Sequence, residues 1–304
     1  MLAYRKKGNL IHTLHPVTML VFILSVFLLS LVFSHPAYLL GLFVAVGAVI
    51  IASDTAREWR SYMKLTLAMI LLIVLINAVV GQAGSTPLFS GARVPLLRHL
   101  RVTVEGLAYG AGMGLRLLVV ISVFCLYTYA VHPDKILSLL SRWMTRATLV
   151  ITLATRLFPL MIGDFYRITE VQRCRGVKFE VGRWWERAGN LVPVASVLLL
   201  SSLERSLLLA ESMHARGFGS GPRSYYRREL WRPRDWLVMA GVMIGAITAL
   251  VAVGRGWSDY MYYPRLAAIT GREVGLASVM TAMFSVPAVL AWGWKSWPWL
   301  RSKI

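Results

Sequence analysis

Residues 17–52 read VTMLVFILSVFLLSLVF, then SHP, then AYLLGLFVAVGAVIIA, so two apolar blocks are separated by only three residues. Each block is close to the ~17–25 residues with which a helix crosses a hydrocarbon core. No A-x-A-like cleavage site follows the first block, and a second block of similar length comes directly after it, which argues against a removed signal peptide. Both blocks are therefore predicted to be retained as membrane-spanning helices.

Four further blocks of this kind follow along the chain. Of the 304 residues, 57% are hydrophobic and the mean hydropathy is +0.61, well above that of an ordinary soluble domain. The sequence predicts an all-α, polytopic membrane protein with about six transmembrane helices. The predicted spans are residues 17–33, 37–52, 62–81, 108–130, 236–254 and 275–292.

The positive charges predict the orientation of the chain, whose formal net charge is +19. Cytoplasmic loops of membrane proteins carry an excess of Lys and Arg. Basic groups precede the first span, follow the second and fourth spans and end the chain, and six spans place all of them on one side of the bilayer. A cytoplasmic N-terminus follows, and this distribution favours a lipid bilayer over nucleic acid as the partner of the charge.

The segment from His132 to Arg234 differs from both of its flanks, because it holds 17 of the 33 Lys and Arg residues. Its apolar runs, 149–162 and 191–203, have about 13 or 14 residues, too few to cross a bilayer. We therefore divide the chain into three regions. They are an N-terminal membrane region with four spans (1–131), a helical region on the cytoplasmic side (132–234) and a C-terminal membrane region with two spans (235–304).

Three helices are expected in the middle region, because proline favours the first turn of a helix and glycine the position just past its end. They cover about 133–144, 149–175 and 193–216, with a connection at 182–190 and a basic surface loop at 218–228. A small hairpin is expected before the fourth span, where turn residues at 84–91 precede a partial alternation at 98–104.

A short phrase occurs twice in the middle region: Glu170-Val-Gln-Arg-Cys-Arg-Gly176 and, 41 residues later, Glu211-Ser-Met-His-Ala-Arg-Gly217. Each copy ends a helical pattern, and both glycines suit the left-handed backbone that follows a helix end. An Arg in the last turn is favoured by the helix dipole, so a single copy has an ordinary structural explanation. The recurrence of the whole phrase favours a docking function instead.

Small residues, Cys174 and Ala215, stand directly before Arg175 and Arg216 in the two copies. A small residue lets a helix end approach a partner closely, and an Arg can bind a carboxylate or cap carbonyl groups. The candidate docking residues are Cys174, Arg175, Gly176, Ala215, Arg216 and Gly217. Glu170 and Glu211 can pair with the residues three positions later, but such pairs stabilise a helix by only a few tenths of a kcal/mol.

In these features the sequence resembles the transmembrane (T) component of energy-coupling factor importers, which are ABC-type micronutrient uptake systems of bacteria and archaea. The second phrase, followed by Phe218-Gly219, is similar to the Ala-Arg-Gly motif of that family, and the first departs from it at Cys174. The resemblance covers roughly residues 10–255, beyond which the chain looks like an extension. Further similar stretches are Leu14-His-Pro-Val-Thr18, Glu105-Gly-Leu107 leading to Arg116, and Arg156-Leu-Phe-Pro159.

The resemblance implies a division of labour in a bacterial or archaeal cell membrane. Two cytosolic ATPase subunits would bind and hydrolyse ATP, a small membrane (S) subunit would capture a vitamin or a cobalt or nickel ion, and this chain would couple them without being an enzyme. The Arg-Gly helix ends would each dock in one ATPase, and apolar helix faces would carry the S subunit. The substrate, and whether one S subunit or several are served, stay open.

The residues of the chain agree with a subunit that has no cofactor of its own. No Gly-x-x-x-x-Gly-Lys-Ser/Thr stretch occurs, so ATP is not gripped by a P-loop here. The two cysteines, Cys125 and Cys174, are interpreted as small apolar fillers, and the six scattered histidines lack ligand spacing, so no metal site is expected.

Two rival functions make different demands on the sequence. A self-sufficient secondary transporter would need ionisable groups near the bilayer midplane, and Arg116 is the one charge well inside a long block. A lipid-modifying enzyme would need clustered Asp or His residues, whereas Asp134, Asp164 and Asp235 are dispersed. Arg116 is expected either to find a structural partner or to serve an interface, and Arg156 to reach towards lipid phosphates.

Overall fold

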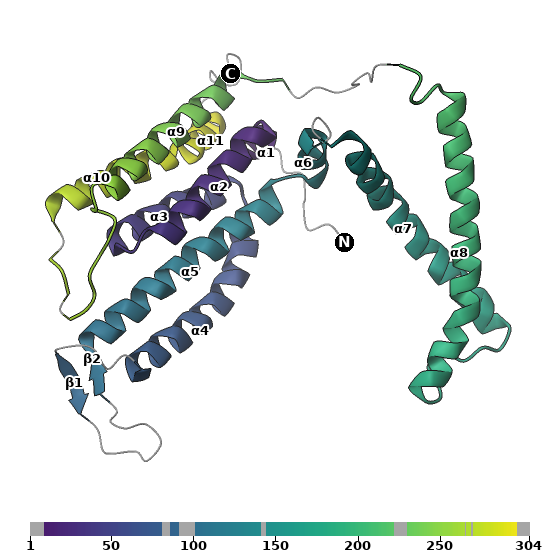
Figure 1. Cartoon of the computed structure of the whole chain (residues 1–304), viewed down its shortest axis with the longest axis horizontal. Coiled ribbons are helices and arrows are strands. Elements are labelled where there is room, and N and C mark those ends of the chain that lie inside the picture. Colours follow the sequence, from purple (N-terminus) through teal and green to yellow (C-terminus); the bar gives the residue numbers. More distant parts are fainter. Residues whose placement is uncertain are drawn as a thin grey trace. The chain divides into compact units, whose positions relative to one another are not determined.

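A computed structural model describes residues 9–80, 86–90, 101–140, 144–221, 230–264, 266–268 and 270–296 (Figure 1). The chain separates into two compact units, one formed by Met1–Ile136 with Glu229–Ile304 and the other by Leu137–Arg228. Each unit is described by itself. The predicted boundaries at residues 131 and 235 stay predictions.

Over their described residues the six predicted spans coincide with helices, which confirms the all-α membrane fold. The first two, α2 (Pro16–Val32) and α3 (Pro36–Ala52), have 17 residues each and rise about 26 Å, the lower limit for a span. The last is a pair of helices bent by 43°. The remaining helices of the first unit are α1 (Leu10–Thr13), α4 (Ala56–Val80), α5 (Val104–Ala130), α9 (Pro233–Gly254), and the bent pair α10 (Gly271–Phe284) and α11 (Val286–Ser296); α6 (Pro133–Leu140) lies at the unit boundary.

Three helices, α2, α3 and α6, begin with the same dipeptide, His-Pro, in which the histidine caps the helix and the proline is its first residue. In each case the imidazole Nδ1 accepts the backbone N–H two residues on, at 3.3 Å for His15, 3.2 Å for His35 and 3.1 Å for His132. The proline at the first helical position has no N–H to satisfy and is preset to the helical φ. An accepting Nδ1 is unprotonated, so these caps need neutral imidazoles.

The core of the first unit lies around α3, which packs against α5 and α10. Glycines allow the close approaches. A Cβ atom added at Gly245 of α9 would lie 2.9 Å from the Phe284 ring of α10, and one added at Gly114 of α5 would lie 2.7 Å from Ile70 of α4. Figure 1 shows α4 beside α5 and α9 beside α10.

The chain beyond residue 254 is part of this core rather than a loose extension, since Met280 and Phe284 of α10 are fully buried. The connection before α10 also folds back onto the turn between α2 and α3. The Ser258 carbonyl accepts the backbone N–H groups of Ser34 and His35 at 3.2 and 3.1 Å, and the Tyr262 hydroxyl donates to the Ser34 carbonyl at 3.0 Å.

The predicted hairpin is confirmed as two short antiparallel strands, β1 (Pro87–Ser90) and β2 (Arg101–Thr103). Residues 91–100 between them lie outside the described part of the chain. Glu105, buried in the first turn of α5, accepts the backbone N–H and the hydroxyl of Thr86 at 3.2 and 2.6 Å. These two bonds tie the hairpin to the start of α5.

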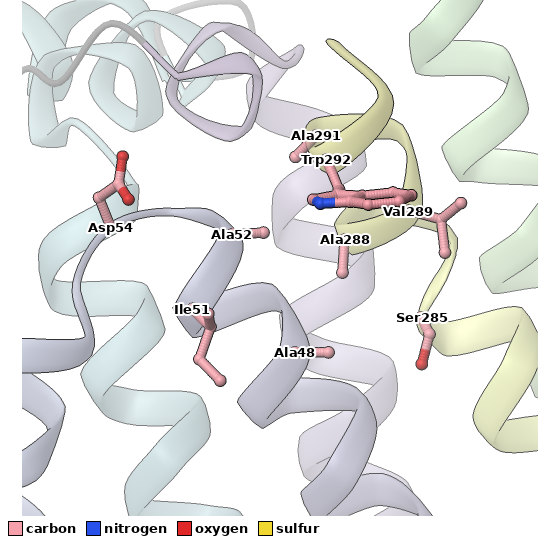
Figure 2. Close-up of a pocket in the computed structure, with 9 residues that line it drawn as sticks. All are labelled: Ala48, Ile51, Ala52, Asp54, Ser285, Ala288, Val289, Ala291 and Trp292. Carbon is pink, nitrogen blue, oxygen red and sulfur yellow. The ribbon is translucent and has the colours of Figure 1, made fainter. Parts of the chain in front are cut away.

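An apolar pocket of about 520 Å³ lies between α3 and the α10–α11 pair (Figure 2). Its lining is mostly small side chains, and Trp292 lies beside its alanines in the close-up. The lining residues are Ala48, Ile51, Ala52, Asp54, Ser285, Ala288, Val289, Ala291 and Trp292. Asp54, the one carboxylate among them, accepts a hydrogen bond from Asn9.

The second unit is built from α7 (Thr145–Cys174) and α8 (Trp184–Ala215), which are longer than predicted. The expectation that these helices are too short to cross a bilayer is wrong. Both are long and apolar enough to do so, as are α4, α5 and α9. Among the described helices this makes five, or six if the bent pair is one span. The expected start of α8 at Pro193 is also wrong, because the helix begins nine residues earlier and holds Pro193 in its interior.

Candidate functional site

The first Arg-Gly phrase forms the end of α7 with a defined backbone geometry. Gly176 has φ +88°, as predicted for the residue past a helix end. Its N–H donates to the Arg173 carbonyl at 2.9 Å, and the N–H of Val177 donates to the Gln172 carbonyl at 3.1 Å. This pair of bonds is the Schellman motif, which satisfies carbonyls that the helix itself leaves open.

The second phrase ends α8 in the same way. Gly217 has φ +70°, its N–H donates to the His214 carbonyl at 2.9 Å, and the N–H of Phe218 donates to the Met213 carbonyl at 3.0 Å. The donors and acceptors occupy the same positions as in the first copy. The repeated sequence therefore produces a repeated structure, with one Arg directly before each left-handed glycine.

The side chains at both ends are presented to the surroundings. Cys174, Arg175, Ala215 and Arg216 are all exposed. In the part of the chain that the structure describes, neither guanidinium has a hydrogen bond or an ion pair. The interpretation of Cys174 as an apolar filler is wrong, whereas Cys125 is buried. Each end thus offers a small residue and an available cation together.

The glutamates of the two phrases, Glu170 and Glu211, are exposed and make no ion pair among the described residues. The expected pairing of Glu170 with Arg173 does not form, because Arg173 reaches Glu180 at 3.0 Å. Glu180 lies in the loop that follows α7. Arg173 thereby joins the last turn of the helix to this loop.

The loop from Arg175 to Arg183 is held by the first turns of α8. The side chains of Asn190 and Arg187 donate to the carbonyls of Lys178 and Gly182 at 2.9 and 3.0 Å. Glu186 accepts the backbone N–H of Arg183 at 3.1 Å, as a helix start requires. The first Arg-Gly end is therefore fixed to the second helix as well as to its own.

The other predicted residues are placed as follows. Arg116 donates to the Phe33 carbonyl at 2.9 Å, so the structure gives it a structural partner. Arg156 and Pro159 lie in the middle of α7, and both are exposed. Pro159 has no N–H for the helix ladder, a usual cause of a local bend.

Apolar side chains cover much of α7 and α8. Leu160, Leu199, Leu203 and Leu207 are 55–65% exposed, and Leu157 and Ile168 are half-buried. Over the described ranges, no group of three or more His, Cys, Asp or Glu side chains is arranged to hold a metal ion. Within this unit the exposed chemistry is apolar helix surface and basic helix ends.

Sequence reasoning missed two features. One is an ion pair between α7 and α8, Asp164 with Arg205 at 2.7 Å. The other is a third Arg-Gly helix end: α9 stops before Arg255, Gly256 has φ +70°, and its N–H donates to the Val253 carbonyl at 3.0 Å. There the guanidinium lies 5.1 Å from the Trp257 ring centre. The backbone motif alone therefore does not define the site. The ends of α7 and α8 differ from that of α9 because, among the described residues, the guanidinium groups of Arg175 and Arg216 contact no aromatic ring and make no hydrogen bond.

Comparison with known proteins gives a consistent result. Residues 7–226 match the CbiQ family, described as cobalt transport protein. The energy-coupling factor transporter transmembrane protein EcfT of Streptococcus thermophilus is 32% identical over 47% of this chain and 58% of its own length. The EcfT protein of Listeria innocua is 28% identical over 66% of this chain and 86% of its own. That of Lactococcus lactis is 23% identical over 82% and 95%.

Proposed function

Because the chain belongs to the cobalt transport protein family, we propose that it is the energy-coupling transmembrane component of an ECF-type importer. The cargo would be a vitamin or a transition-metal ion such as cobalt or nickel. The observation that carries this proposal is the pair of exposed Arg-Gly helix ends, which share one backbone geometry and one set of cap bonds. The EcfT relatives support the same function through the name they carry.

Two ATPase subunits are the partners that fit the two ends. Each end offers a bidentate donor, Arg175 or Arg216, beside a small residue, and such a donor suits a carboxylate or exposed carbonyls in a groove. ATP binding and hydrolysis belong to these partners, since this chain has no P-loop and is a transport component rather than an enzyme.

The third partner would be a small substrate-binding membrane protein resting on α7 and α8. Both helices expose long apolar surfaces, and only 6% of the most apolar window of each is buried within the chain. Closure of the ATPase pair on ATP would move the Arg-Gly ends, and the helices would transmit that movement to the bound subunit. The energy is thus supplied by one set of partners and used by another.

The chain is a multi-pass membrane protein. From its basic residues we infer that its N-terminus and its middle region lie on the cytoplasmic side of a bacterial or archaeal membrane. Although α7 and α8 are long enough to cross a bilayer, the proposal has them lie along that side, so that both Arg-Gly ends face the cytoplasm. With this orientation α9 would carry Arg255 to the outer face. An Arg-Gly end there would be out of reach of a cytosolic ATPase. Arg255 is therefore a matched control for Arg175 and Arg216.

The proposal is tested by purifying the tagged chain from its native membrane in mild detergent and identifying the proteins that accompany it by mass spectrometry. We expect two ATPase subunits and a small membrane protein, whose identity would indicate the cargo. Recovery of the chain alone, under conditions that keep other membrane complexes together, would contradict the proposal and favour a self-sufficient transporter.

A further inference from the structure

An ion pair joins α7 to α8, two helices that are in contact and cross (Figure 1). The Asp164 Oδ2 and Arg205 Nη2 atoms are 2.7 Å apart, and the Asp164 side chain is only 15% exposed. The other carboxylate oxygen, Oδ1, accepts from Arg167, the next cation on the same helix, at 3.3 Å, and Arg167 is 76% exposed. Among the described residues, Asp164–Arg205 is the only ion pair between the two helices.

The positions of this pair match the repeat of the docking phrase. Asp164 and Arg205 are 41 residues apart, the separation that also relates Arg175 to Arg216. Each therefore stands ten residues before the last helical residue, Cys174 or Ala215. At a rise of 1.5 Å per residue, each helix end lies about 15 Å along its own helix from the residue of the ion pair.

We infer that Asp164 and Arg205 are positioning residues, which fix the angle between α7 and α8 and thereby the spacing of the two Arg-Gly ends. This inference rests on the proposed docking of those ends to an ATPase pair. Asp164 and Arg205 act through the helix geometry and touch no partner themselves. A change of 20° in the angle between the helices, taken about this ion pair, would move one end relative to the other by about 5 Å, close to one helical turn.

The test measures the spacing directly in the full-length chain. Spin labels are attached at Val171→Cys and Ser212→Cys, exposed positions that are also 41 residues apart, after Cys125 and Cys174 are replaced by alanine. Pulsed electron–electron double resonance then gives the distribution of distances between the two spin labels, with the chain in nanodiscs. We expect one narrow distribution for the native pair and a broad or displaced one for Asp164→Ala.

Two further variants separate pairing from general damage. Arg167→Gln is the matched control and should leave the distribution unchanged, because Arg167 contacts Asp164 from the same helix. In the Arg167→Gln variant, exchanging the two charges of the ion pair with Asp164→Arg and Arg205→Asp should give the narrow distribution again. If Asp164→Ala does not fold, Asp164→Asn keeps the side-chain volume and serves in its place.

Retention of ATPase subunits provides the functional readout. Loss of the ion pair should lower the apparent affinity for the ATPase pair roughly tenfold, which corresponds to about 1.4 kcal/mol of binding free energy. An unchanged distance distribution in Asp164→Ala would overturn the inference. The distances are measured without ATPases. If the distribution broadens in Asp164→Ala and the charge exchange narrows it again, the positioning role of the ion pair stands, even if Arg175 and Arg216 prove unnecessary for docking.

Discussion

Replacing Gly176 by Ala tests the first helix end at the level of its backbone. Gly176 has φ +88°, a conformation that costs a residue with a Cβ atom about 1–2 kcal/mol. A Cβ atom at this position would meet no other atom within 4 Å, so steric overlap adds nothing to this cost. The whole effect should fall on the last turn of α7 and its two cap bonds.

The cost converts directly into weaker docking if the ATPase binds only the formed cap. Since 1.4 kcal/mol corresponds to a tenfold change, the affinity for the ATPase pair should fall by about 5- to 30-fold. The affinity is measured with the purified chain in nanodiscs. Amide hydrogen exchange at residues 172–177, measured on the same sample, should become faster as the cap opens more often.

Gly189→Ala provides the control for this experiment. Gly189 lies within α8 at a helical φ, and an added Cβ atom would again meet nothing within 4 Å. Alanine there should stabilise the helix by up to about 1 kcal/mol and leave docking unchanged. Gly176→Ala with native affinity and native exchange would refute the role of the left-handed cap.

Two further outcomes follow from the first unit. Burial lowers the pKa of His35 below 6.5, although Glu273 at 3.3 Å has the opposite effect. As the pH falls, His35 is therefore protonated in the unfolded chain before it is protonated in the folded one. The free energy of unfolding should decline as the pH falls below about 6.5. Thermal unfolding between pH 5 and 8 should show this decline, and His35→Asn should reduce it; equal slopes in both proteins would contradict the neutral cap. Gly245→Ala should lower the free energy of unfolding by about 1–3 kcal/mol because the new methyl group meets the Phe284 ring at 2.9 Å. Gly254→Ala, where an added Cβ has open space, should be nearly neutral, and equal losses at the two glycines would show that the packing is not the cause.

The helix ends could be predicted from sequence because their cause is local. Gly176 and Gly217 follow helical patterns with a cation before them, and both have the expected left-handed backbone. The start of α8 could not be predicted in the same way. Pro193 resembles a first-turn proline, whereas the actual start depends on Glu186 accepting the Arg183 N–H, a signal that a single Glu carries weakly.

The contacts between residues far apart in the chain could not be predicted from the sequence. In the sequence, Asp164 is one of several dispersed carboxylates, since nothing local shows that α7 packs against α8 so that Asp164 meets Arg205. Its 41-residue separation from Arg205 equals the repeat of the phrase and was the available signal. The packing of Met280 and Phe284 into the core likewise depends on the contact of α10 with α3, which periodicity along the chain does not specify.

The central claim is that Arg175 and Arg216 hold the two ATPase subunits. It is tested most directly by the number of ATPase subunits that remain with the purified chain in the double variant Arg175→Glu, Arg216→Glu, with Arg255→Glu as the control. We expect the double variant to lose both subunits, each single variant to retain them weakly, and Arg255→Glu to retain both. A double variant that keeps both ATPase subunits at native stoichiometry and affinity would contradict the account.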